Sequence, residues 1–96
     1  MKDNFKKKSF KISVVGAGYI GAVLGAVLAD KGNYVTEIDV NENIINSYKK
    51  GKSPVNEPGL EKLIKKVISN GQLTATNDYS SIKEADVILI TVGTPL

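Results

Sequence analysis

The chain has 96 residues, of which 42% are hydrophobic and 24% charged, so we expect one globular domain or part of one. It contains no cysteine and no histidine, which excludes disulfides, cysteine-based metal sites and the commonest metal ligand, and we expect no metal site. The formal net charge is only +3, and lysines occupy positions 6–8, so the rest of the chain has no basic face for nucleic acid.

The N-terminal part of the chain follows the order strand, glycine-rich turn, helix, strand and acid. Residues 1–10 are mostly polar and rich in lysine, which is typical of a flexible, solvated tail. Residues 11–15 read KISVV, and their almost continuously apolar character favours a central parallel strand. Residues 16–21 read GAGYIG and lead into a predicted helix over residues 19–31. Residues 34–38 form a second predicted strand.

The predicted helix over residues 19–31 has two kinds of apolar surface. Large side chains recur at helical spacing at positions 20, 23, 24, 27 and 28 and form one stripe. Small residues at positions 21, 22, 25, 26 and 29 keep the remaining surface thin, so that the helix can approach a sheet closely. Gly32 is well placed to end this helix.

The middle of the chain predicts two more helices. Asn41 is expected to cap a helix that runs to about residue 50 and ends at Gly51, with three residues facing inward: Ile44, Ile45 and Tyr48. After a loop over residues 52–57, Pro58 fits the first turn of a third helix, where its missing N–H is tolerated. That helix is apolar at positions 60, 63, 64, 67 and 68, and Asn70-Gly71 fits its C-terminal cap better than a hairpin turn.

The last third of the chain predicts two strands separated by a short element. Residues 73–76 form a short strand, and Asp78 caps a turn or short helix over residues 78–84. Residues 87–92 read VILITV and are predicted to be the most clearly buried strand of the chain.

Four strands separated by helices predict an α/β fold, a Rossmann-like doubly wound parallel sheet over residues 11–96. The sequence stops just past the end of a strand expected at the centre of that sheet, where open α/β sheets bind their ligands. We therefore expect these residues to be the N-terminal portion of a longer protein, with the rest of the domain absent.

The glycine-rich turn predicts a dinucleotide site. Gly16 permits a tight turn out of the first strand, and Gly18 lets the backbone approach a pyrophosphate because it has no Cβ. Gly21 lets the helix pack closely on the strand. The helix N-terminus then presents free N–H groups to the phosphates. Glycine is common, so the flanking strand and helix carry most of the weight of this prediction.

Asp39 lies eighteen residues after Gly21, near the spacing expected for the acid that binds the adenosine ribose. Its carboxylate would accept from both ribose hydroxyls and repel a 2′-phosphate, and residues 40–46 contain no Lys or Arg, so NAD is preferred over NADP. The alternative is that Asp39 only caps the second helix. Glu37 is a rival acid, but it falls short of the strand end. Thr94 follows the last strand, and its position favours cofactor contact over a role in closing a turn.

Residues 12–29 could be mistaken for a membrane span, because they carry no charge and follow a lysine cluster. The cluster of glycines and the later strand and Asp39 argue against this, and we expect no membrane partner. Glu57 has two interpretations: a site residue, or an acid favoured at a helix start by the helix dipole. Its chemistry alone favours the second.

Several segments, in order, match one family. They are residues 16–21 (GAGYIG), 38–39 (ID), 54–60 (PVNEPGL), 71–76 (GQLTAT), 85–87 (ADV) and 94–95 (TP). From about residue 11 to residue 96 the chain resembles the N-terminal NAD domain of the UDP-sugar dehydrogenases, which include UDP-glucose 6-dehydrogenase and UDP-N-acetylmannosamine dehydrogenase. The EPGL and TP segments are far more specific to this family than the glycines.

This resemblance implies an enzyme that oxidises the C6 alcohol of a UDP-hexose to the uronate and reduces two NAD. The catalytic cysteine of the family and its Lys and Asp partners would lie beyond this chain, so no catalytic residue is expected within it. Tyr19 and Ile20 would contact the cofactor backbone, Asp39 the adenosine ribose, and Thr94 the NAD near the active site. The resemblance further implies a cytoplasmic homo-oligomer that acts in polysaccharide biosynthesis.

Two positions depart from the family pattern, and other functions stay open. Ile44 stands where many members have a basic residue, and Gly93 precedes Thr-Pro where another residue is often found. The alternatives are a hydroxyacyl- or 6-phosphogluconate-type dehydrogenase with the same entry unit, against which the Glu57-Pro58-Gly59 segment argues, and a module that senses NAD without chemistry.

Overall fold

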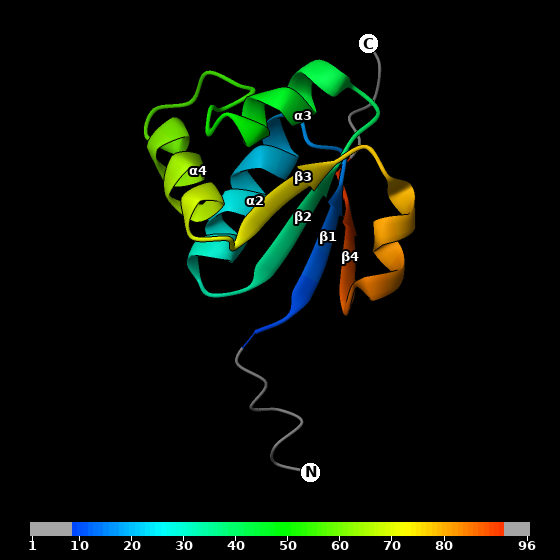
Figure 1. The fold of residues 1–96 in the computed structure, drawn as a ribbon. Coiled ribbons are helices and arrows are strands. Elements are labelled where there is room, and N and C mark those ends of the chain that lie inside the picture. The colour runs from blue at the N-terminus through cyan, green and yellow to red at the C-terminus, as the bar shows by residue number, and fades with distance from the viewer. Residues whose placement is uncertain (1–8, 92–96) are drawn as a thin grey trace.

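A computed structural model describes residues 9–91 as a parallel four-stranded sheet with helices packed on it (Figure 1). The elements in chain order are β1 (Lys11–Val15), α2 (Tyr19–Asp30), β2 (Tyr34–Ile38), α3 (Glu42–Lys49), α4 (Leu60–Ser69), β3 (Leu73–Thr76), the 3₁₀ helix η1 (Tyr79–Glu84) and β4 (Val87–Ile90). The strand order is β3-β2-β1-β4 and every pairing is parallel. The predicted α/β class and parallel sheet are confirmed.

The strand order changes direction at β1. The chain first builds outward from β1 to β2 and β3, and then returns to place β4 on the other side of β1. Val15, the last residue of β1, is in register with Ile38 of β2 and with Ile90 of β4. All strands therefore end at one edge, the upper one in Figure 1, and the turn after β1 lies at the switch point of the sheet.

Helix α2 packs on the sheet through its small residues, as predicted. Its buried residues are Gly21, Ala22, Gly25, Ala26 and Ala29. The larger side chains on the other surface remain accessible, with Ile20 59% exposed and Leu24 39% exposed. A helix without bulky side chains on one surface can lie close to the strands, so the backbone at its N-terminus comes near the ends of β1 and β4.

Helices α3 and α4 complete the cover of the same sheet face, and η1 lies on the other face (Figure 1). Asn41 caps α3 as predicted, because its side chain accepts from the amides of Asn43 and Ile44. Tyr48 and Ile64 are fully buried in the core beneath α3 and α4. Glycines with positive φ follow α2, α3 and α4 at the predicted positions 32, 51 and 71.

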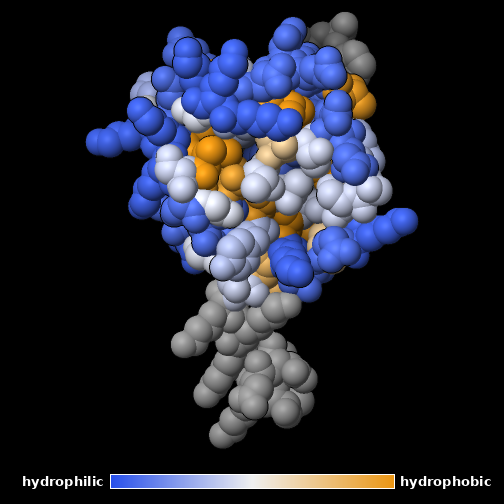
Figure 2. Space-filling model, in the orientation of Figure 1, coloured by the Kyte–Doolittle hydropathy of each residue, from blue (hydrophilic) through white to orange (hydrophobic). Residues whose placement is uncertain are grey.

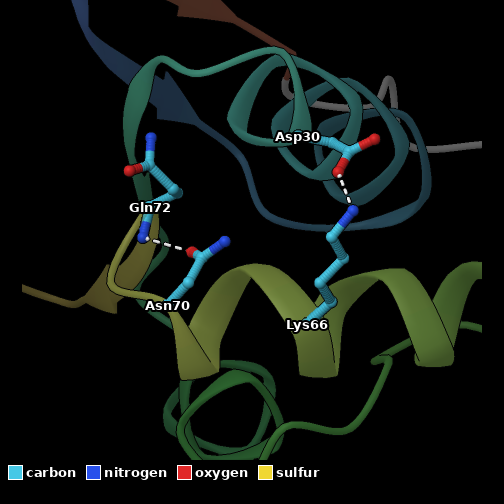
Figure 3. Close-up of polar contacts among 4 residues, drawn as sticks. All are labelled: Asp30, Lys66, Asn70 and Gln72. Carbon is cyan, nitrogen blue, oxygen red and sulfur yellow. Dashed lines mark hydrogen bonds and ion pairs between the residues drawn. The ribbon is translucent and has the colours of Figure 1, made fainter.

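Polar contacts join α4 to its neighbours at the far end of the molecule from the switch point (Figure 3). Lys66 of α4 forms an ion pair with Asp30 at the end of α2, at 2.8 Å between Nζ and Oδ1. The amide of Gln72 donates to the side chain of Asn70 and so closes the turn into β3. The side chains of Lys66 and Asp30 are 64% and 39% exposed, so the ion pair contributes at most about 1 kcal/mol to stability.

Two predictions about these elements are wrong. Pro58 does not enter the first turn of the third helix: Gly59 precedes α4 with φ +80, which is outside helical geometry, and the Leu60 amide donates to the Glu57 carbonyl in a turn. Strand β4 is not the best-buried strand, because Ile88 is 46% and Ile90 72% exposed. Only η1 covers that face among residues 9–91, and β4 lies at the sheet edge.

The tail over residues 1–10, except its last two residues, lies outside the described residues, as do Val92 and Thr94. In the space-filling view, hydrophobic side chains gather in the middle of the visible face, below hydrophilic ones at the end where the strands finish (Figure 2). Within residues 9–91, none of the helices has the length and apolar character that crossing a membrane requires.

Candidate functional site

The glycine turn connects β1 to α2 and lies at the switch point. Gly16 has φ +100, a conformation that other residues rarely adopt, and its amide donates to the Ile38 carbonyl at 2.8 Å. Gly21 lies so close below the turn that a Cβ placed on it would be 1.9 Å from the Gly16 carbonyl oxygen. Gly21 thus brings the first turn of α2 directly against the end of β1. This is the close packing of helix on strand that the sequence predicted for Gly21.

Gly18 differs from Gly21, because a Cβ placed on it would meet no atom within 4 Å. Its φ of −76° is accessible to any residue. Within residues 9–91 its amide has no hydrogen-bond acceptor. Gly18 therefore opens onto free space beside the N-terminus of α2, where backbone amides point outward and the helix dipole is positive.

Asp39 reaches back from the end of β2 to the glycine turn. Its Oδ2 accepts from the Ala17 amide at 2.9 Å and its Oδ1 accepts from the Asn41 amide at 2.9 Å. The residue is partly buried, and each oxygen keeps a lone pair for a further donor. The cap of α3 is Asn41, so the alternative in which Asp39 is only a helix cap is wrong.

Two further side chains, which the sequence analysis did not assign to the site, hold the same turn. The hydroxyl of Tyr48 on α3 donates to the Ala17 carbonyl at 2.9 Å. The hydroxyl of Thr91, which follows β4, donates to the Gly16 carbonyl. A buried tyrosine needs a partner for its hydroxyl, so the inward position of Tyr48 was a usable signal, although the sequence alone does not say which partner it finds.

Tyr19 and Glu57 connect the start of α2 to the loop before α4. The Tyr19 hydroxyl donates to Glu57 Oε1 at 2.8 Å, and this hydrogen bond and the negative charge of Glu57 raise the pKa of Tyr19. Both residues line a shallow hollow of about 370 Å³. Glu57 therefore contacts a residue of the glycine turn, which its interpretation as a helix-dipole acid did not anticipate.

The remaining predicted site residues are spread around this turn. Ile20 is 59% exposed at the start of α2, on the surface away from the sheet. Ile44, which stands in place of a basic residue, is partly buried and packs against the core. Gly16, Gly18, Tyr19, Gly21 and Asp39 lie together at the switch point. Thr94 lies outside the described residues.

Glu37 occupies the core two residues before Asp39. Its side chain is fully buried, and neither carboxyl oxygen has a hydrogen-bond partner among residues 9–91. Burial, and to a lesser extent the charge of Asp39, raises the pKa of Glu37 to about 9. The carboxyl is therefore protonated at neutral pH, and it faces Gly25 of α2 rather than the switch point.

A parallel sheet with a glycine turn at its switch point and an acid at the end of the second strand defines a dinucleotide-binding domain. Comparison with known proteins gives the family. Residues 10–96 match the NAD binding domain of the UDP-glucose/GDP-mannose dehydrogenase family, and the chain belongs to this family.

Relatives named for two different substrates, UDP-glucose and GDP-mannose, match the chain with similar sequence identity. The chain is 46% identical over 87 residues to UDP-glucose 6-dehydrogenase of Bacillus subtilis, covering 90% of this chain and 19% of the relative. It is 44% identical to GDP-mannose 6-dehydrogenase of Pseudomonas putida, covering 88% of this chain and 20% of the relative. The chain thus spans about a fifth of the length of these relatives.

Solved structures agree. A ternary complex of GDP-mannose dehydrogenase from Pseudomonas aeruginosa matches with a TM-score of 0.85 and 41% identity, over 88% of this chain and 20% of that one. UDP-N-acetyl-mannosamine dehydrogenase of Staphylococcus aureus matches with a TM-score of 0.82 and 34% identity, over 88% of this chain and 20% of that one. The cofactor of this domain is NAD, as the sequence predicted.

Proposed function

We propose that this chain is the cofactor-binding part of an enzyme that oxidises the C6 alcohol of a UDP-hexose, UDP-N-acetylmannosamine or UDP-glucose, to the uronate. Family membership and the fit of the glycine turn to a dinucleotide support this proposal. NAD, when bound, supplies the acceptor for hydride. The alternatives, another dehydrogenase class or a module that only senses NAD, have no support from the matched family.

The residues of this chain divide the binding of NAD among them. Gly16 and Gly21 set the turn close to the sheet, and Gly18 leaves room for the pyrophosphate beside the free amides of α2. Asp39 accepts from the adenosine ribose with the lone pairs that Ala17 and Asn41 leave free. Tyr19 and Ile20, at the start of α2, would contact the cofactor backbone.

Thr94 is proposed to contact NAD near the active site, as the resemblance implies. Residues 11–96 are proposed to be an incomplete NAD-binding domain that follows a tail over residues 1–10. The catalytic cysteine and its partners would lie outside these residues. The whole enzyme is proposed to be a cytoplasmic homo-oligomer of polysaccharide biosynthesis, with no nucleic-acid partner.

GDP-mannose is a second candidate substrate, because relatives of that name match almost as closely as the UDP-glucose enzyme. The test is to supply the protein in its full natural length with NAD and each of UDP-glucose, UDP-N-acetylmannosamine and GDP-mannose, and to follow the absorbance of reduced cofactor. Reduction with a UDP-hexose supports the proposal, and reduction with GDP-mannose alone moves it to the second candidate. No reduction with any nucleotide sugar would contradict both.

Cofactor choice has its own test. The Asp39 carboxylate would lie next to the 2′-phosphate of NADP, and residues 40–46 hold no cation to offset the repulsion. We expect NAD to bind at least tenfold more tightly than NADP, measured by calorimetric titration of each. Asp39→Asn should narrow this difference, whereas Glu42→Gln, which removes a nearby exposed charge, should leave it largely unchanged. Equal affinities in the wild type would contradict the ribose role of Asp39.

A further inference from the structure

We propose that Tyr48 is a positioning residue for the dinucleotide site, because its hydroxyl fixes the peptide group between Ala17 and Gly18 and so aims the Gly18 amide at the pyrophosphate. This inference rests on the proposed function and adds a residue outside the glycine turn to the site. It starts from a buried side chain on α3, an element that contributes no residue to the predicted NAD contacts.

The contact of Tyr48 is buried on both sides. Tyr48 and Ala17 are each 0% exposed, and the Tyr48 hydroxyl donates to the Ala17 carbonyl at 2.9 Å. A buried carbonyl without a partner is unfavourable, so this hydroxyl determines which way the carbonyl points. Burial raises the pKa of Tyr48, so the hydroxyl stays protonated and remains a donor at neutral pH.

The orientation of that carbonyl determines the direction of the next amide. Residues 9–91 contain no cis peptide bond, and in a trans peptide the C=O and N–H groups point in opposite directions. The Ala17 carbonyl points inward to Tyr48, so the Gly18 N–H points outward. That amide has no acceptor within residues 9–91 and borders the open space beside Gly18.

The peptide group on the other side of Ala17 is held as well, because its N–H donates to Asp39. Asp39 and Tyr48 thus hold two successive peptide groups from opposite ends. Asp39 lies where the ribose is proposed to bind, whereas Tyr48 is fully buried and reaches no ligand. Tyr48 therefore acts only through the backbone, so it is a positioning residue and not a catalytic one.

The test is Tyr48→Phe, which keeps the buried ring and removes the hydroxyl. NAD, ADP and adenosine are titrated separately by NMR, and the NMR order parameter of the Gly18 N–H is measured in the absence of ligand. We expect Kd for NAD and ADP to rise about tenfold, the factor that corresponds to one hydrogen bond, and Kd for adenosine to change less than about twofold. The order parameter of the Gly18 N–H should fall, because its peptide group loses the contact that holds it.

Two control variants separate positioning from general loss of stability. Tyr34→Phe removes a hydroxyl from an exposed tyrosine at the opposite end of the sheet. Ile64→Val loosens the core beneath α4, in a different helix from Tyr48. Both should bind NAD, ADP and adenosine as the wild type does.

The inference would be overturned if Tyr48→Phe kept the wild-type affinity for NAD, or if it lost affinity for NAD and for adenosine equally. The proposed function would remain intact in both cases. An equal loss of NAD affinity in the Ile64→Val variant would also overturn the inference. If the wild-type protein binds no NAD, the proposed function fails first, and the positioning role fails with it. Selective loss of affinity for NAD and ADP, together with a lower order parameter of the Gly18 N–H, supports the inference.

Discussion

The glycine turn and the contact between Glu37 and α2 lie about three residues apart along the sheet. They differ in whether their buried polar groups have hydrogen-bond partners. At the turn, Asp39, Tyr48 and Thr91 each pair with a backbone group of residues 16–17. Below it, the Glu37 carboxyl faces Gly25 with no partner for either oxygen. The turn gains a defined geometry from its hydrogen bonds, whereas the Glu37 contact only lowers stability.

The largest effect is expected for Gly21→Ala, which changes the turn itself. The new Cβ would be 1.9 Å from the Gly16 carbonyl oxygen and 2.8 Å from the Thr91 hydroxyl, so α2 must move away from β1. We expect the free energy of unfolding to fall by about 3 kcal/mol, measured by urea denaturation, with loss of NAD binding. A variant as stable as the wild type would mean that α2 does not pack this closely.

The next effect concerns the pH dependence that Glu37 causes. Its pKa is about 9 in the folded protein and near 4.5 in the unfolded chain, so the folded state binds the additional proton between these values. The contribution of this group to stability is therefore fully present below pH 4.5 and is lost as the pH rises toward 9. The expected loss is about 2.6 kcal/mol between pH 6 and pH 8.

Glu37→Gln should remove this slope, because the amide does not ionise. Glu84→Gln is the matched control, since Glu84 is exposed on η1 and its replacement should leave the slope in place. Urea denaturation of the three proteins at pH 6, 7 and 8 measures the effect. Identical slopes in the wild type and Glu37→Gln would show that Glu37 is hydrated or paired in solution.

A third change tests whether Glu37 and Gly25 share one space. A Cβ on Gly25 would be 1.8 Å from Glu37 Oε2, so Gly25→Ala should lower the unfolding free energy by about 1–2 kcal/mol. In a Glu37→Ala background the space is free, and the same change should become neutral or stabilising, because Ala favours a helix over Gly. Additive effects in the double-mutant cycle would contradict the contact.

These contacts show which parts of the structure were accessible from the sequence. Strand β1, the glycine turn, α2 and β2 follow from local periodicity and turn chemistry, and the observed bounds agree with the prediction within one residue. Asp39 could be predicted because its distance from Gly21 is set by the lengths of α2 and β2.

The rest depends on contacts between distant segments. The Tyr48 and Glu57 partners lie 31 and 38 residues away, and no local pattern predicts them. The apolar sequence of β4 indicates a strand but not its exposure, which depends on what covers it. Pro58 is permitted in a first helical turn, but the positive φ of Gly59 delays the helix to Leu60.

The smallest effect on stability is expected for Gly18→Ala, the counterpart of Gly21→Ala within the same turn. The new methyl group would meet no atom within 4 Å, and φ −76 suits alanine, so the unfolding free energy should change by less than about 0.5 kcal/mol. The methyl group would instead occupy the space proposed for the pyrophosphate, and Kd for NAD should rise at least tenfold in calorimetric titration. A stable variant with wild-type NAD affinity would mean that the pyrophosphate does not approach Gly18. The pair would then show that, of these two positions, only Gly21 requires glycine, because protein atoms lie within reach of a Cβ there and none do at Gly18.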